Sequence, residues 1–214
     1  ADPRIFEYLR FPEEFRVHWL SWKLPGKDES LEDYAFRMCE DVHDDEPILI
    51  GVSFGGVLVQ EMSKIINTKK ILIISSVKTH HELPPRMKFA RDYGIYKYLP
   101  TGFLDYIYQI DRLPVGNFIK KRIQLYKTYL SVNDKAYLDW SIKNIVCWKQ
   151  ESPPENLVHI HGDQDLVFPI RYINECITVK GGTHIMILNR FRWFNEHMVH
   201  YLQTSSTQIE KSSI

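Results

Sequence analysis

The chain has 214 residues, 44% of them hydrophobic, so it is long enough to bury one substantial core, and we expect a single compact fold. Its 27 Lys and Arg residues balance its 27 Asp and Glu residues, which excludes a strong attraction to nucleic acid or to an anionic membrane. No apolar run approaches the roughly 20 residues needed to span a bilayer. A reducing cytoplasm and no disulfide framework are expected, because no CxxC pair occurs among Cys39, Cys147 and Cys176.

The beginning of the chain shows a strand pattern and then a helix pattern. Residues 15–22 (FRVHWLSW) are rich in aromatic and β-branched residues and predict a strand that ends at Leu-Pro-Gly, 24–26. Ser30 is a candidate N-cap, with Asp33 three residues later. The helix that follows is predicted to bury one face, comprising Leu31, Tyr34, Ala35, Met38, Cys39 and Val42.

Short apolar runs alternate with helical segments through most of the remaining chain. Residues 47–51 and 71–74 lack polar alternation, as is typical of strands covered on both faces, and residues 56–66 between them predict a helix. Two more strands are predicted at 157–161 and 176–179. A last helix carries one apolar stripe, comprising Phe191, Phe194, Met198 and Tyr201. The pattern predicts an α/β fold with a mostly parallel sheet flanked by helices.

The middle of the chain interrupts this alternation. Residues 77–150 contain helical segments rich in Tyr, Phe and Lys that are broken by Pro-Pro, Pro-Thr-Gly and Pro-Val-Gly, and no strand is convincing there. We therefore expect residues 1–76 and 151–205 to form the core and residues 77–150 to form a helical insertion. Residues 206–214 are polar and unpatterned, and we expect a flexible tail.

A GxSxG motif at 51–55 surrounds Ser53. It directly follows a predicted buried strand and opens a helix, which is where a tight turn would present a serine hydroxyl at the edge of the sheet. Gly51 and Gly55 are expected to avoid clashes in that turn, and Gly56 extends the clearance. The alternative is a small-residue turn at a strand–helix junction with an incidental serine.

A serine hydroxyl is a poor nucleophile at neutral pH, so the hypothesis requires a base and a carboxylate that orients it. Asp163 and Asp165 follow the strand predicted at 157–161, and His184 follows the strand predicted at 176–179. Functional groups gather at the carboxyl ends of the strands in an open parallel sheet. We therefore expect these side chains to meet Ser53 on one rim.

Three segments, Gly-Val-Ser-Phe-Gly-Gly, His-Gly-Asp-Gln-Asp and Gly-Gly-Thr-His, resemble in this order the nucleophile elbow, acid loop and histidine loop of the α/β-hydrolase superfamily, as in its esterases and lipases. The resemblance covers most of the chain outside the insertion. It implies Ser53 as nucleophile, Asp165 as acid and His184 as base, with Asp163 as the competing acid.

The resemblance also implies what such a protein would do. It implies a covalent acyl-enzyme, a helical lid at 77–150 and a small ester or thioester as substrate, with no cofactor. Acyl transfer to an acceptor other than water is a related possibility. A binding protein that keeps the fold without useful turnover is an alternative from another class, because one scaffold hosts many functions.

One part of the superfamily's pattern is not present in the sequence. The backbone N–H of Phe54 can serve as one oxyanion donor, but the second usually comes from a Gly-containing loop that precedes the first helix. In the superfamily's strand order, the strand leading into that loop lies between those predicted at 15–22 and 47–51. We expect the native protein to have roughly 15–20 further N-terminal residues, which would supply this strand and loop.

Several histidines and aromatic residues have two possible interpretations, one structural and one functional. His159 and His161 alternate on a strand ahead of Asp163 and Asp165, so they could bind a metal, but strand histidines are more often packed or hydrogen-bonded, and no metal site is expected. His80 and His81 are expected in a solvated loop. The rings of the insertion could line an apolar pocket or could attach the lid to the core: Tyr93, Tyr96, Tyr98, Phe103, Tyr106, Tyr108, Trp140 and Trp148.

Overall fold

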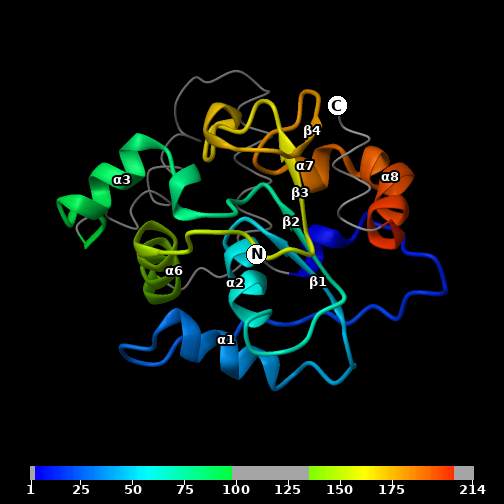
Figure 1. Cartoon of the computed structure of the whole chain (residues 1–214), viewed down its shortest axis with the longest axis horizontal. Helices are drawn as coiled ribbons and strands as arrows, with labels where there is room; N and C mark the ends of the chain where they lie inside the picture. The colour runs from blue at the N-terminus through cyan, green and yellow to red at the C-terminus, as the bar shows by residue number, and fades with distance from the viewer. Residues whose placement is uncertain (1–2, 98–134, 205–214) are drawn as a thin grey trace.

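A computed structural model describes residues 3–97 and 135–204 of the chain (Figure 1). Its centre is a four-stranded sheet in which every neighbouring pair is parallel, in the order β1-β2-β3-β4. The predicted parallel sheet is therefore confirmed, with boundaries within one residue of those expected. The strands are β1 (Ile48–Val52), β2 (Lys70–Ile74), β3 (Leu157–Gly162) and β4 (Ile177–Val179).

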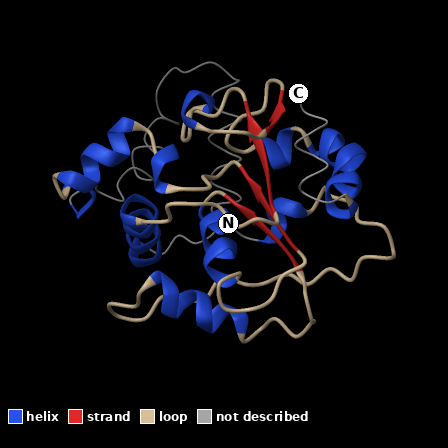
Figure 2. Cartoon of the chain, in the orientation of Figure 1, coloured by secondary structure: helices blue, strands red, loops and turns tan. Residues whose placement is uncertain are grey.

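Helices cover both faces of this sheet (Figure 2). Helices α1, α2 and α6 lie on one side of it, and α7 and α8 lie on the other (Figure 1). The α-helices are α1 (Leu31–Cys39), α2 (Phe54–Met62), α3 (Pro85–Asp92), α6 (Lys135–Cys147), α7 (Met186–Asn189) and α8 (Phe191–Gln203). Short 3₁₀ helices are η1 (Pro3–Phe6), η2 (His80–Glu82), η3 (Ile95–Lys97) and η4 (Ile170–Tyr172).

Strand β2 shows why an uninterrupted apolar run forms a strand here. All five of its residues are buried. Because successive side chains point to opposite faces, Ile71 and Ile73 enter the core beneath α1, α2 and α6, whereas Leu72 and Ile74 enter the core beneath α7 and α8. Both faces of the strand are covered, so all five of its positions are buried and four of them are apolar.

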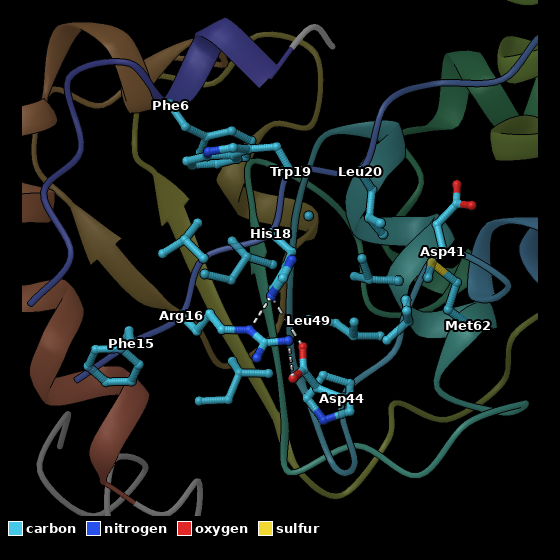
Figure 3. Close-up of a pocket in the computed structure, with 18 of the residues that line it drawn as sticks. Phe6, Phe15, Arg16, His18, Trp19, Leu20, Asp41, Asp44, Leu49 and Met62 are labelled. Atoms are coloured by element: carbon cyan, nitrogen blue, oxygen red, sulfur yellow. Dashed lines mark hydrogen bonds and ion pairs between the residues drawn. The ribbon is translucent and has the colours of Figure 1, made fainter. Parts of the chain in front are cut away.

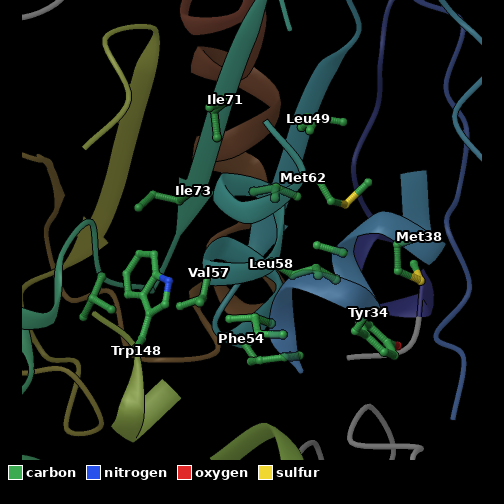
Figure 4. Packing of buried hydrophobic residues seen from close by; sticks show 14 of the residues in the cluster. Tyr34, Met38, Leu49, Phe54, Val57, Leu58, Met62, Ile71, Ile73 and Trp148 are labelled. Carbon is green, nitrogen blue, oxygen red and sulfur yellow. The ribbon is translucent and has the colours of Figure 1, made fainter. Parts of the chain in front are cut away.

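Helix α1 forms as its sequence predicts. The Ser30 hydroxyl accepts a hydrogen bond from the backbone N–H of Asp33 at 3.0 Å, which satisfies one donor of the first turn. The buried face packs against α2, where Tyr34 and Met38 lie beside Leu58 and Met62 (Figure 4). This contact fixes α2, and with it the turn at the end of β1.

The strand predicted at 15–22 is not formed. Within the described residues the sheet ends at β1, and a cavity of about 530 Å³ lies between β1 and the extended segment 15–22 (Figure 3). The aromatic residues of the segment pack on other rings instead of pairing in a ladder: Trp19 stacks on Phe6 with centroids 5.2 Å apart, and Trp22 stacks on Phe54 at 5.7 Å. The aromatic residues of segment 15–22, which predicted a strand, therefore serve to pack against other rings.

The described parts of the insertion, 77–97 and 135–150, contain helices and no strand. The remainder of the predicted lid and the predicted tail at 206–214 lie outside the described residues. Among the residues that the structure describes, none of the helices combines the length and the apolar character that crossing a bilayer requires.

Candidate active site

Ser53 lies in the tight turn between β1 and α2. Its backbone has φ 56° and ψ −121°, a conformation that non-glycine residues rarely adopt and that costs on the order of 1–3 kcal/mol. Two hydrogen bonds hold it: the Ser53 N–H donates to the Ile74 carbonyl at 3.0 Å, and the Ser76 hydroxyl donates to the Ser53 carbonyl at 2.8 Å. The neighbouring strand therefore maintains a strained turn that presents the Ser53 side chain.

The glycines around Ser53 differ in how much the turn needs them. A Cβ at Gly51 would overlap the Gly55 backbone carbonyl, and a Cβ at Gly56 would lie within 2.5 Å of the Ser76 side chain. At Gly55 a Cβ would make only ordinary contacts, with Trp22 atoms at 3.8–3.9 Å. The expectation of a close approach therefore holds at Gly51 and Gly56 and is wrong at Gly55.

The structure brings Ser53, His184 and Asp165 together in one chain of hydrogen bonds. His184 Nε2 lies 2.9 Å from Ser53 Oγ, and His184 Nδ1 lies 2.8 Å from Asp165 Oδ2. Because a carboxylate only accepts hydrogen bonds, His184 donates from Nδ1, and its Nε2 lone pair faces the serine hydroxyl. This is the tautomer that a general base for Ser53 requires.

Asp165 is fixed and kept ionised by its surroundings. Its side chain is fully buried, and Oδ1 accepts hydrogen bonds from the backbone N–H groups of Val167 at 2.7 Å and Phe168 at 3.0 Å. Burial alone would raise the pKa of this carboxyl, but the charge and hydrogen bond of His184 and the Phe168 amide outweigh burial and lower the pKa below its ordinary value. Asp165 therefore remains a carboxylate beside the imidazole.

Asp163, the competing acid, lies elsewhere. Its Oδ1 accepts a hydrogen bond from the Gly181 N–H at 2.7 Å in an exposed position. This bond ties the loop after β3 to the loop that carries His184. Asp163 thus joins two loops of the site without contacting the imidazole of His184.

His159 and His161 are buried and hydrogen-bonded, and they do not converge with Asp163 on a metal position. His161 Nε2 lies 2.8 Å from the Phe168 carbonyl, so it donates there, and its Nδ1 accepts from His159 Nε2 at 3.1 Å. Burial lowers the pKa of both rings, although the Asp165 charge partly opposes this at His161. His161 therefore holds the segment that supplies amides to Asp165, a role that the sequence pattern did not indicate.

Aromatic residues attach the insertion to the core beside the turn. Trp140 donates from Nε1 to the Glu29 carbonyl at 2.7 Å and packs on Tyr34 with ring centroids 4.6 Å apart. Trp148 donates from Nε1 to the Glu61 carboxylate at 2.6 Å. Both tryptophans thus fasten α6 and its C-terminal end to the core. The rings at 98, 103, 106 and 108 lie outside the described residues.

The residue expected to provide an oxyanion donor, Phe54, lies in the first turn of α2. Phe54 is the first residue of this helix, where backbone N–H groups have no intrahelical acceptor. The Phe54 amide is adjacent to Ser53 and is available to a developing negative charge there.

The cavity of Figure 3 is lined by Gly51 and Gly55, but Ser53 does not line it, so this cavity lies behind the turn.

Neither a protein-family model nor a curated protein sequence matches the chain. Among solved structures, a bromoperoxidase from Bacillus anthracis is similar to the chain, with a TM-score of 0.61 and 15% sequence identity. The esterase EaEST from Exiguobacterium antarcticum is also similar, with a TM-score of 0.60 and 17% sequence identity. Each comparison covers 95% of this chain and 88% of the other chain. The chain has the α/β-hydrolase fold. A third structure with this fold, Est816, described as an N-acyl homoserine lactone degrading enzyme, has a TM-score of 0.56 at 16% identity and covers 94% of this chain and 88% of its own.

Proposed function

We propose that this α/β-hydrolase-fold protein is a serine hydrolase that cleaves a small carboxylic ester or thioester. The observation that carries the proposal is the continuous chain Ser53 Oγ, His184 Nε2, His184 Nδ1 and Asp165 Oδ2, with contacts of 2.9 and 2.8 Å. The positive φ of Ser53 adds support, because strained backbone concentrates at functional sites. The compared structure that is named as an esterase, EaEST, agrees with this chemistry.

The geometry supports a two-step acyl-enzyme mechanism. Ser53 Oγ attacks the substrate carbonyl while its proton passes to His184 Nε2, and the oxyanion that forms accepts a hydrogen bond from the Phe54 N–H. His184 then gives the proton to the departing alkoxide or thiolate, which leaves an acyl ester on Ser53. Asp165 stabilises the imidazolium throughout this step.

Hydrolysis of the acyl-enzyme uses the same groups, with water as the nucleophile and Ser53 Oγ as the leaving group. A water molecule loses a proton to His184 Nε2 and attacks the acyl carbonyl, and the second tetrahedral intermediate collapses as His184 returns the proton to Ser53 Oγ. The products are the carboxylic acid and free enzyme. Attack by an alcohol or thiol in place of water would give acyl transfer, and these three residues alone do not select the acceptor.

Labelling with a fluorophosphonate tests the nucleophile directly, because the probe phosphonylates an activated serine with loss of fluoride. We expect the native chain to label, and Ser53→Ala and His184→Ala to lose labelling. Ser63→Ala and His197→Ala are matched controls on α2's C-cap and on α8, and they should label at the native rate. Absence of labelling in a folded native sample, or labelling that persists in Ser53→Ala, would refute the proposal.

A series of p-nitrophenyl esters of increasing acyl length then addresses the substrate. The native chain and Ser53→Ala are assayed side by side, so that only hydrolysis dependent on Ser53 is counted. A maximum at one chain length would define the acyl preference, and the corresponding thioester would show whether the leaving group matters.

A further inference from the structure

The chain leaves the core after β2 and returns before β3 through a narrow junction, which we call the neck of the insertion and define as residues 78–81 and 150–151. The two sides of the neck are joined by hydrogen bonds. The backbone N–H of His80 donates to the Gln150 carbonyl at 3.1 Å, and the Gln150 side chain donates to the Lys78 carbonyl at 2.9 Å. Residues about 70 positions apart in sequence are thus held side by side.

Three potential metal ligands gather at this neck. A ring nitrogen of His80, a ring nitrogen of His81 and a carboxylate oxygen of Glu151 lie within 4.8 Å of one another. His81 Nε2 is 2.9 Å from Glu151 Oε2, and His80 Nε2 is 3.9 Å from Glu151 Oε1. In a tetrahedral site with Zn–N bonds of about 2.0–2.1 Å, neighbouring donor atoms are about 3.3 Å apart. Small side-chain rotations would therefore bring these donors to coordinating distance.

One imidazole is already oriented as a ligand. His80 Nδ1 lies 2.9 Å from the Gln150 carbonyl, which can only accept, so Nδ1 carries the proton and the Nε2 lone pair is directed toward the cluster. A hydrogen bond from the non-coordinating nitrogen to a backbone carbonyl is the usual outer contact of a metal-binding histidine. The His81 ring lies beside it, with centroids 3.9 Å apart.

The surroundings distinguish Glu151 from Glu82, the acid that directly follows the neck. Glu82 is buried and its carboxylate accepts hydrogen bonds from the backbone N–H groups of Lys78 at 2.6 Å and Asn174 at 2.9 Å, so it is committed to the fold. The Glu151 side chain is 73% exposed and the His81 side chain 59% exposed, which leaves them open to an ion from solvent. Lys88 directs its ammonium to the His81 carbonyl at 2.7 Å.

We propose that His80, His81 and Glu151 bind one divalent ion of the zinc class, which clamps the neck of the insertion. Two imidazoles and one carboxylate suit Zn²⁺, whereas Mg²⁺ and Ca²⁺ require oxygen ligands. The ion would link His81 and Glu151, which are 70 positions apart. The proposal is independent of Ser53 chemistry.

Isothermal titration of metal-free protein with ZnCl₂ tests the site without any measurement of activity. We expect one ion per chain, binding at least tenfold weaker in His81→Ala and in Glu151→Gln, and none at this site in a His80→Ala/His81→Ala variant. His43→Ala and Glu155→Gln change an exposed histidine and an exposed carboxylate away from the cluster and should bind like the native chain. MgCl₂ should give no binding heat.

Thermal unfolding supplies a second measurement. An ion that binds only the native state favours folding about 100-fold when its concentration is 100 times its Kd, so ZnCl₂ should raise the unfolding temperature of the native chain and of both controls, but not of the double variant. Circular dichroism verifies that each variant is folded. Failure of the native chain to bind Zn²⁺, or binding and stabilisation that persist in the double variant, would overturn the proposal.

Discussion

Replacing Asp165 by asparagine would force a choice between two sets of hydrogen bonds. The carboxylate accepts from the amides of Val167 and Phe168 with Oδ1 and from His184 with Oδ2. An asparagine that keeps its oxygen toward the two amides turns its NH₂ group toward His184 Nδ1. The imidazole would then accept at Nδ1 and carry its proton on Nε2, facing the hydroxyl of Ser53, where it cannot act as a base.

The expected loss is about 10³- to 10⁴-fold in kcat/KM, the size seen when a triad loses the carboxylate that sets its histidine tautomer. Asp163→Asn is the matched control, because the asparagine Oδ1 can still accept the hydrogen bond from the Gly181 N–H, and this variant should stay within about threefold of the native rate. Ester hydrolysis and the rate of fluorophosphonate labelling measure both variants. A tenfold or smaller loss in Asp165→Asn, or an equal loss in Asp163→Asn, would refute the assignment.

Stability measurements test three other features of the site. Gly51→Ala should lower the free energy of unfolding by about 1–3 kcal/mol, because the new Cβ would overlap the backbone of Gly55, whereas Gly55→Ala should change it by under about 1 kcal/mol. Equal effects of the two substitutions in urea titrations would contradict the close approach at Gly51. Burial lowers the pKa of His159 and His161, so the unfolded chain binds more protons than the folded chain at mildly acidic pH. The free energy of unfolding should therefore fall between pH 7 and pH 5, by up to about 1.4 kcal/mol per pH unit for each ring. If the dependence of the free energy of unfolding on pH is unchanged in His159→Gln, this explanation is wrong. The lowered pKa of Asp165 stabilises the fold at pH values above the pKa of an aspartate in the unfolded chain, about 3.9. The difference in free energy of unfolding between the native chain and Asp165→Asn should therefore shrink as the pH falls below that value. Urea titrations at pH 5 and pH 3 measure this difference.

Elements whose formation depends on local signals could be predicted from the sequence. Ser30 and Asp33 marked the start of α1 because a cap is a contact between residues three apart. The strands β1 and β2 were found because a strand covered on both faces is apolar along most of its length. These signals depend on a few neighbouring residues and on burial, which the chain encodes directly.

Pairing between distant segments was not encoded in this way. The segment 15–22 has the composition of a strand, but a strand also needs a partner, and across the cavity from this segment lies β1. Trp19 and Trp22 gain their contacts from the rings of Phe6 and Phe54 instead. Aromatic residues favour both sheet and ring packing, so composition alone does not distinguish the two.

The three residues of the proposed triad could be located because a parallel sheet gives a rule for residues far apart in sequence. The register aligns Val52 with Ile74, Ile74 with Ile160, and Ile160 with Ile177. Strand β1 ends at Val52, and β3 and β4 each continue two residues further, to Gly162 and Val179, so the loops after all three strands begin at the same edge of the sheet. Any polar residue soon after such a strand is a candidate for that edge. Residues outside this rule, such as His161, which points into the core, and Glu151, which meets His81 across the neck, become visible only when the packing of the chain is known.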